Sequence, residues 1–411
     1  MSAMDIDGDV STVLATIRSE TESPELINLL YQLEDYYERK LYHQLTQLLD
    51  EFYYTFDQSI ITPDLKHKVY TRFISEFQLK LNHIKVVDFL LESFKTDQEV
   101  LDKLIELKKL LIDNLKKENN IKDSEDDKEL LNKIVSDDES IIYIDLQIAR
   151  YYLKLNKSHD SEEILNKLST KFDNLNNNLI SKINAAYYLT KLEYDHILKN
   201  YNEFYSNGLL YLSSTKNLSK DESIKLCYEL CISALLGDKI YNFGELILHD
   251  ILKEIESENS QYFWLFNLIQ NLNSGNLTEF NNWLSIAFEK SPMLKQHELF
   301  LKQKIIIMGL LELISTKSTT NKQLKFDEIS QFTGTPKNDV EHLIIKCFSL
   351  NLIKGYINQV DERLIITWLQ PRILNLQQVK TLYDHLLNWD NKVEELGRSV
   401  YENGGTVWAG V

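Results

Sequence analysis

Glycine and proline are almost absent from the first half of this 411-residue chain. No glycine falls between Gly8 and Gly208, and only Pro24 and Pro63 interrupt that span. Glycine and proline disfavour helix interiors more strongly than any other residues, whereas the Leu, Lys and Glu that are abundant here favour them. The span is therefore predicted to consist of α-helices joined by short turns.

Apolar residues recur along this span at the spacing of one helix face. Polar breaks such as 156–160 separate the stripes, which predicts helix hairpins of about tetratricopeptide size, but without the signature residues of that repeat. Such hairpins bury a core only by stacking on their neighbours, so we expect an irregular helical solenoid. The acidic residues 116–140 are expected to form a solvated, partly disordered loop. The first stripes are Leu26, Leu29, Leu30 and Leu33, then Leu41, Leu45, Leu48, Leu49 and Phe52.

A different pattern follows residue 324. Two helix starts, at Phe326 and at Thr335-Pro336, precede two stretches with strand character at 354–360 and 363–368. Apolar residues alternate with period two in the second stretch, as they do in strands. The order helix, helix, helix, hairpin predicts a winged helix. Its strand edges are predicted to be able to pair with a strand of a neighbouring protein; they carry Tyr356, Ile357, Ile365 and Thr367.

The charge of the chain argues against nucleic acid as a partner. The sequence has 45 Lys and Arg against 62 Asp and Glu, a net charge of −17. The second helix of the predicted winged helix exposes Asp339 and Glu341, with Lys346 as its one certain cation. Duplex binding draws its affinity from cations that neutralise phosphates, so we expect no nucleic-acid partner. We also expect no membrane partner, because the longest apolar run, 305–311, is too short to span a bilayer.

A heptad pattern occupies residues 379–400. Its apolar residues are spaced 3, 4, 3, 4, 3, 4, which makes an a/d seam three heptads long. One interpretation is that the seam packs on the chain's own domain, and the other is that it binds helices of partner proteins. The regular period favours the second, because a helix lying on a globular core usually shows a broader stripe. The seam residues are Val379, Leu382, Leu386, Trp389, Val393, Leu396 and Val400.

No pattern typical of a catalytic, cofactor or metal site is present. The nine histidines are scattered without zinc-peptidase spacing, and no glycine-rich phosphate loop or G-x-S-x-G elbow occurs. Cys227 and Cys231 share one face of an apparent helix but lack further ligands, so buried structural cysteines are the simpler interpretation. Three cysteines in a chain of this length indicate a reducing compartment. The sequence predicts a protein that is not an enzyme and carries no cofactor or metal.

Several blocks of the sequence resemble one protein family. The most specific is SALLGDKIYNFGEL at 233–246, and it is accompanied by QHE at 296–298, DVEHL at 339–343 and WLQPR at 368–372. Over residues 31–400 the chain is similar to the PCI-domain lid subunits of the 26S proteasome, in particular to regulatory-particle non-ATPase subunit nine. Within the block at 233–246 we predict a tight packing turn rather than a ligand site. The residues of this predicted turn are Gly237, Asp238, Lys239, Tyr241, Asn242, Phe243 and Gly244.

The resemblance implies a non-catalytic scaffold for lid assembly and ubiquitin-dependent protein degradation, in the cytoplasm and nucleus. It implies helical repeats at 1–180, a PCI domain at 181–370 with a helical part (181–315) and a winged helix (316–370), and a bundle helix and tail at 371–411. The implied partners are a neighbouring PCI subunit, the deubiquitinase pair of MPN subunits and the von Willebrand-type ubiquitin receptor. The alternative is a PCI scaffold of another complex, the signalosome or a translation initiation factor.

Overall fold

The computed structural model describes residues 10–19, 23–55, 61–119, 131, 133–174, 180–215, 218–257, 260–316, 323–371 and 376–404. Helices account for most of this part of the chain, and strands occur in it only between Gln323 and Leu369. The prediction of a mostly helical fold that ends in a winged helix and a C-terminal helix is confirmed. Two compact units are present, one formed by Met1–Lys199 and Leu210–Lys216 and the other by Asn200–Leu209 and Asn217–Val411.

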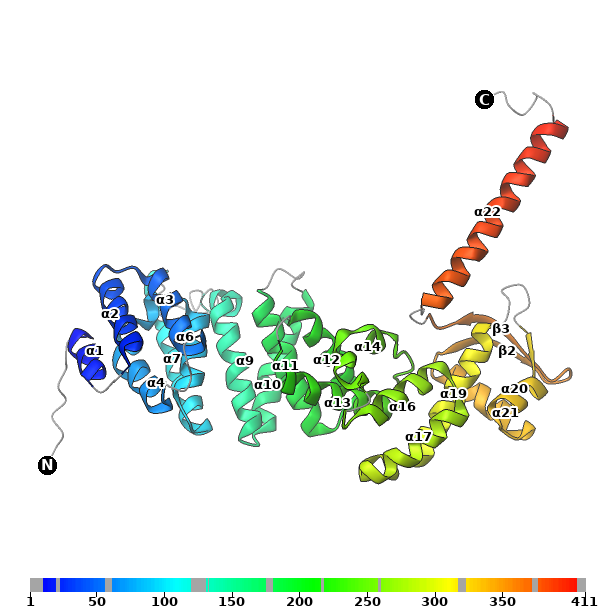
Figure 1. Ribbon diagram of the computed structural model, residues 1–411, viewed down its shortest axis with the longest axis horizontal. Coiled ribbons are helices and arrows are strands. Elements are labelled where there is room, and N and C mark those ends of the chain that lie inside the picture. Colours follow the sequence, from blue (N-terminus) through cyan, green and yellow to red (C-terminus); the bar gives the residue numbers. More distant parts are fainter. Residues whose placement is uncertain are drawn as a thin grey trace. The chain divides into compact units, whose positions relative to one another are not determined.

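The first unit is a succession of packed helices, in which α9 lies against α7, α10 and α11 (Figure 1). The predicted apolar stripes form its core, although Leu41 is 38% exposed and lies outside it. The elements are α1 (Val10–Ser19), α2 (Pro24–Glu38), α3 (Tyr42–Asp50), η1 (Glu51–Thr55), α4 (Pro63–Val69), η2 (Tyr70–Ile74), α5 (Ser75–Phe77), η3 (Gln78–Lys80), α6 (His83–Ser93), α7 (Asp97–Glu118), α9 (Glu139–Lys154), α10 (Ser158–Asn174) and α11 (Ser181–Leu198).

The predicted acidic loop is shorter than residues 116–140. Helix α7 continues to Glu118, residues 133–137 are helical, and α9 begins at Glu139, where Asp138 caps it by accepting hydrogen bonds from the amides of Ser140 and Ile141. Asp138 and Glu139 therefore lie at the start of α9, where carboxylates cap free amides and meet the positive end of the helix dipole. The most acidic part, 120–130, lies outside the described residues.

Turns in this glycine-poor unit place ordinary residues in the left-handed region. Lys40, Asn156 and Lys199 have φ values of 58°, 58° and 57°, each just after a helix end. A Cβ atom makes this conformation cost roughly 1–2 kcal/mol, and glycine avoids that cost. The absence of glycine thus favours helices, but it leaves the hairpin turns strained.

We expect Lys199→Gly to stabilise the first unit by about 0.5–1 kcal/mol, because the relieved strain exceeds the added freedom of glycine in the unfolded chain. Lys199→Ala is the matched control, since alanine removes the side chain but keeps the Cβ atom. Urea unfolding followed by far-UV circular dichroism measures both. Equal unfolding free energies of the two variants would show that the left-handed conformation of residue 199 is not strained.

The second unit begins with helices and ends with the sheet and a long helix. Its elements are part of α12 (Tyr201–Ser214), α13 (Lys220–Leu236), α14 (Gly244–Leu248), η4 (Asp250–Leu252), α15 (Lys253–Glu256), α16 (Phe263–Ser274), α17 (Leu277–Lys290), α18 (Pro292–Gln296), α19 (Glu298–Thr316), β1 (Gln323–Lys325), α20 (Phe326–Thr333), α21 (Lys337–Ser349), β2 (Ile353–Asn358), β3 (Arg363–Leu369) and α22 (Leu376–Gly404). The order α19, β1, α20, α21, β2, β3 is that of a winged helix, and we call 298–369 the winged-helix module.

The sheet of the module has a strand that the sequence did not predict. Its order is β1-β3-β2 with both pairings antiparallel, so Ile365 lies opposite Gln323 on one side and Tyr356 on the other. The prediction that Ile365 lies on a sheet edge is therefore wrong, because the three-residue strand β1 makes β3 central. Thr367 faces the hairpin, where its hydroxyl donates to the Lys354 carbonyl at 3.0 Å.

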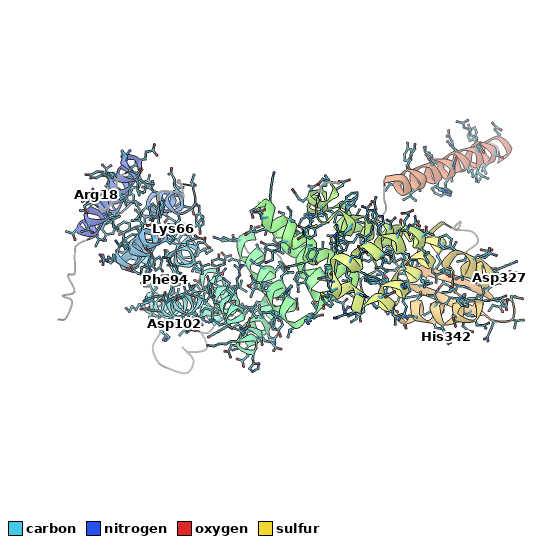
Figure 2. The ribbon with its side chains drawn as sticks, turned by 60° about the horizontal axis from the view of Figure 1, so that its bottom comes forward. Arg18, Lys66, Phe94, Asp102, Asp327 and His342 are labelled. Carbon is cyan, nitrogen blue, oxygen red and sulfur yellow. The ribbon has the colours of Figure 1, made fainter. Side chains whose placement is uncertain are left out.

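Two local features hold the hairpin to the module. A Cβ atom at Gly355 would lie 2.1 Å from the Ile365 carbonyl oxygen, so the close approach of the strands at this irregular register requires glycine. Lys337 at the start of α21 forms ion pairs with Asp327 of α20 (2.9 Å; labelled in Figure 2) and with Glu362 of the hairpin turn (2.5 Å). The turn and both helices are thereby joined through one ammonium group.

Candidate protein-interaction site

Helix α22 carries the most extended exposed apolar surface among the described residues. Every α22 side chain whose placement is described is exposed, and the seven seam residues Val379, Leu382, Leu386, Trp389, Val393, Leu396 and Val400 are 46–66% exposed. Tyr383, Leu387 and Tyr401 are also exposed and widen the stripe beyond the a/d positions. Contiguous apolar surface of this kind is typical of an interface. The sequence missed these three residues because they lie outside the a/d positions, Tyr383 at position e beside the seam and Leu387 and Tyr401 at position b next to it.

The winged-helix module has exposed apolar residues but no cationic face. On the edge strand β2, Tyr356 is 58% exposed and Ile357 is half-buried, and Val360 at the turn is 94% exposed. On α21, Glu341 accepts a hydrogen bond from the Gln359 amide at 3.2 Å, and the cation Lys337 is held between two carboxylates. Val360 was not predicted, although its place beside the short Asp361-Glu362 link makes exposure expected.

The block at 237–244 forms a turn between α13 and α14 that is packed from several sides. A Cβ atom at Gly237 would lie 2.4 Å from Ile240 Cδ1 and 2.9 Å from Asn202 Oδ1, so the turn has no room for a side chain there. Asn202 of α12 donates to the Asp238 carboxylate at 2.5 Å and accepts from the Lys239 amide at 3.2 Å.

Within the turn, Asn242 and the aromatic residues complete the packing. The Asn242 side chain accepts a hydrogen bond from the Gly244 amide at 3.3 Å, and its carbonyl accepts one from the Tyr205 hydroxyl at 3.4 Å. Tyr241 and Phe243 are buried. The side chains of Asp238 and Asn242 thus have hydrogen-bond partners within the protein, which is the arrangement of a structural turn.

Lys304 of α19 is buried beneath this turn. Its ammonium group donates to the carbonyls of Ala234 (2.7 Å), Leu235 (3.2 Å) and Gly237 (2.6 Å). Lys304 is 1% exposed, and burial lowers its pKa to about 7, although the nearby Asp238 carboxylate favours the charged form. The sequence did not identify this residue, because nothing distinguishes it from exposed lysines such as Lys302.

The pKa of Lys304 predicts how stability depends on pH. Its ordinary value is 10.5, so between pH 7 and 10.5 the unfolded chain binds more protons than the folded chain, and the stability contributed at this site rises with pH. We expect the unfolding free energy of the wild type, relative to Lys304→Met, to rise by up to about 1.4 kcal/mol per pH unit between pH 7.5 and 9.5. All five tryptophans lie in the second unit, so their fluorescence during urea unfolding reports on it. If the difference in unfolding free energy between wild type and Lys304→Met stays constant or falls as the pH rises, the pKa of Lys304 is not lowered in the folded chain.

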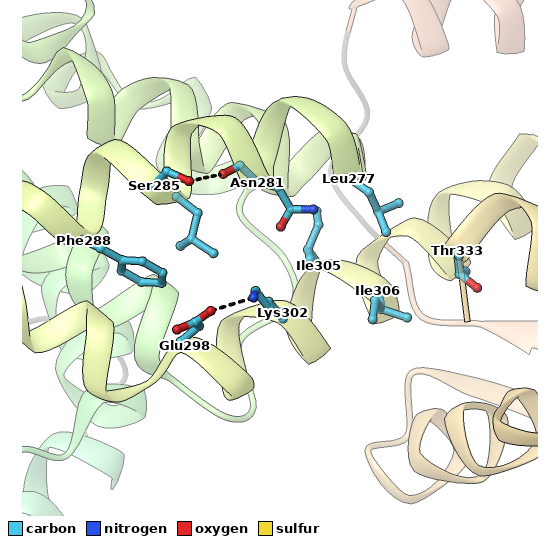
Figure 3. Close-up of a pocket in the computed structure, with 11 residues that line it drawn as sticks. Leu277, Asn281, Ser285, Phe288, Glu298, Lys302, Ile305, Ile306 and Thr333 are labelled. Atoms are coloured by element: carbon cyan, nitrogen blue, oxygen red, sulfur yellow. Dashed lines mark hydrogen bonds and ion pairs between the residues drawn. The ribbon is translucent and has the colours of Figure 1, made fainter. Parts of the chain in front are cut away.

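A groove of about 550 Å³ lies between α17, α19 and the end of α20 (Figure 3). Its walls are mainly Leu277, Leu284, Phe288, Ile305 and Ile306. Its charged groups are Glu298 and Lys302, which form an ion pair of 2.6 Å with each other. The two charged groups pair with each other within one helix, and the other residues that line the groove are apolar or uncharged.

Among the residues that the structure describes, no cluster of three or more His, Cys, Asp or Glu side chains could hold a metal ion, and the three cysteines are buried and form no disulfide. None of the helices in the described ranges is both long and apolar enough to span a membrane.

Comparison with known proteins places both parts of the chain. Residues 29–269 match the family model of PSD13 N-terminal repeats, and residues 281–368 match that of the PCI domain. The chain is 37% identical to the 26S proteasome regulatory subunit RPN9 of Saccharomyces cerevisiae over 97% of its own length and 98% of that protein. It is 31% identical to the 26S proteasome non-ATPase regulatory subunit 13 homolog B of Arabidopsis thaliana, over 90% of this chain and 92% of the relative.

Similarity to a translation initiation factor subunit is weaker and partial. A eukaryotic translation initiation factor 3 subunit M from Coccidioides immitis is 23% identical over 183 residues, which are 43% of this chain and 37% of that protein. The match to the PSD13 N-terminal repeats and the similarity to RPN9 over nearly the full length favour the proteasome subunits over the initiation factor subunit. The chain therefore belongs to the family of 26S proteasome regulatory subunits that includes RPN9 and non-ATPase regulatory subunit 13.

Proposed function

We propose that the chain is a non-catalytic structural subunit of the lid of the 26S proteasome regulatory particle, and that it supports ubiquitin-dependent protein degradation by holding other subunits in place. The observation that carries this proposal is the exposed seam of α22, 46–66% accessible over three heptads, in a chain whose relatives are named as proteasome regulatory subunits. A helix with this much exposed apolar surface is stabilised when partner helices cover it.

We assign the proposed roles to three consecutive regions of the chain. Residues 1–180 form the helical-repeat region, 181–370 the PCI domain and 371–411 the bundle helix with its tail. The seam, including Leu386 and Trp389, packs in a bundle with helices of other lid subunits. Tyr356 and Ile357 on the edge strand β2 contact a neighbouring PCI subunit, because β2 has one side without a partner strand among the described residues.

The finer partners are part of the same proposal. They are a neighbouring PCI subunit, the deubiquitinase pair of MPN subunits and the von Willebrand-type ubiquitin receptor, encountered in the cytoplasm and nucleus. The chain itself contributes no chemistry in this scheme: the groove beside Lys302 lacks converging titratable groups. The alternative, a scaffold of a translation initiation factor complex, has support only from partial matches, over 183 and 81 residues.

Purification from the organism's own cells tests the proposal. The chain is tagged, isolated at moderate salt, and its companions are identified by mass spectrometry. Lid and base subunits of the proteasome are the expected companions. Recovery of initiation-factor or signalosome subunits in their place would retain the fold and reject the function, and recovery of the chain alone would reject the scaffold proposal.

We also expect the winged-helix module not to bind duplex nucleic acid. Lys337 is engaged by Asp327 and Glu362, and α21 adds Asp339 and Glu341, so the helix that would enter a groove offers too few cations to neutralise phosphates. The measurement is a fluorescence-anisotropy titration of the full chain with a labelled duplex at low and moderate salt. Micromolar binding that weakens steeply with salt would contradict the expectation.

A further inference from the structure

The carboxyl end of α13 leaves main-chain carbonyls that the helix itself cannot satisfy. Helix α13 ends at Leu236, so the carbonyls of its last turn have no amide four residues further along the helix. Two of them, at Ala234 and Leu235, accept hydrogen bonds from Lys304, as does the carbonyl of Gly237 just beyond the helix end. A lysine ammonium has three donors, and the site has three acceptors.

Aromatic rings surround the same ammonium group. The rings of Tyr241 and Phe243 in the turn have centroids 5.4 Å from Lys304 Nζ, and that of Phe300, one helical turn earlier in α19, is 5.6 Å away. Rings within about 6 Å attract a cation through their faces. The titratable groups that face this site are Asp238 and Tyr241 in the turn.

Lys304 belongs to a helix that connects two layers of the second unit. Helix α19 packs on α13, α16 and α17 and also on α20 of the winged-helix module. Helix α21 is joined to α19 as well, because the Lys346 ammonium donates a hydrogen bond to the Gln303 side chain at 3.1 Å. A rigid helix held at Lys304 therefore determines where the rest of the module lies on α13.

We propose that Lys304 is a buried latch: its ammonium group, held by three main-chain carbonyls and three aromatic rings, fixes the winged-helix module on the end of α13, so that the two move as one body. The turn at 237–244 provides one carbonyl and two of the aromatic rings that bind the ammonium group. Gly237 is needed because a side chain there would meet Ile240 and Asn202, and both Tyr241 and Phe243 supply ring faces to the cation. This role is a property of the chain itself and is independent of which complex the chain joins.

The test uses hydrogen exchange of the full chain at pH 6, below the pKa of Lys304, so that its side chain carries the ammonium, with two lysine variants. Lys304→Met keeps the length of the side chain and removes the ammonium, and Lys302→Met is the matched control, since Lys302 lies on the same helix but outside this site. We expect Lys304→Met to speed amide exchange by at least roughly tenfold in both 234–246 and 337–369, with α9 of the first unit unchanged. Lys302→Met is expected to change neither segment.

Three results would overturn the latch. They are unchanged exchange at 234–246, acceleration at 234–246 without any at 337–369, and equal effects of the two variants. Should Lys304→Met fail to fold, the wild-type chain still decides the matter by labelling with an amine-reactive reagent. A closed latch predicts that Lys304 reacts at least roughly a hundredfold more slowly than Lys302, whereas similar rates would show that it is open.

Discussion

Simultaneous replacement of Leu386, Trp389 and Val393 by alanine is expected to remove the chain from its complex while leaving the isolated chain almost as stable as before. These side chains are 57%, 66% and 46% exposed, so truncation takes little apolar contact from the chain's own core. In a bundle, each central apolar residue contributes roughly 1–2 kcal/mol or more, and the loss of three corresponds to more than about a hundredfold in affinity.

Two measurements on this triple variant separate the interpretations of α22. The melting temperature of the purified chain reports on self-packing, and the amount of variant recovered in the assembled complex reports on binding. A matched control replaces Asp384, Asn388 and Glu395 by alanine, because they lie on the helix face opposite the seam. A large fall in the melting temperature of the seam variant would show that the helix folds back on its own chain.

Replacement of Asp88 by alanine is expected to destabilise the first unit by about 3 kcal/mol. Asp88 of α6 is 8% exposed; it accepts a hydrogen bond from the Tyr143 hydroxyl of α9 at 2.7 Å and forms an ion pair with Lys182 of α11. The variant leaves the buried Tyr143 hydroxyl without that acceptor and a partly buried ammonium without its counter-ion. Removing one partner from such a group costs much more than the group contributes when intact.

Urea unfolding followed by far-UV circular dichroism measures the effect of Asp88→Ala. Asp102→Ala is the control: this carboxylate is exposed on α7 (labelled in Figure 2) and accepts a hydrogen bond only four residues away, from Gln98. We expect Asp102→Ala to change stability by less than about 0.5 kcal/mol. Similar values for the two variants would mean that the three helices are not joined through Asp88.

Local patterns predicted the helices, including the position of α22, well. Glycine scarcity and apolar periodicity located the helical repeats, since both act within one turn of a helix, and the heptads located α22 because its residues are neighbours on one face. The turn at 237–244 was identified from a resemblance and not from its chemistry. Helix ends were harder: α7 and α9 extend into the predicted acidic loop because charged residues also serve as helix termini.

Features that depend on distant partners were not predictable. Asp88 meets Lys182 at a separation of 94 residues, and Lys304 meets the carbonyl of Ala234 at a separation of 70. No local pattern indicates which of 45 cations will be buried. The strand β1 was missed for a similar reason, because three residues carry too little period-2 signal and only their pairing with Arg363–Ile365 makes them a strand.

Cross-linking of the purified native complex with an amine-reactive reagent tests the central claim, that the seam of α22 is covered by other proteins. Lys380 and Lys392 lie on α22 at exposed positions and report on its surroundings. We expect both lysines to link mainly to helices of other proteasome regulatory subunits, and these links to disappear in the Leu386, Trp389 and Val393 triple variant. Links confined to residues 260–369 of the chain itself would contradict the central claim.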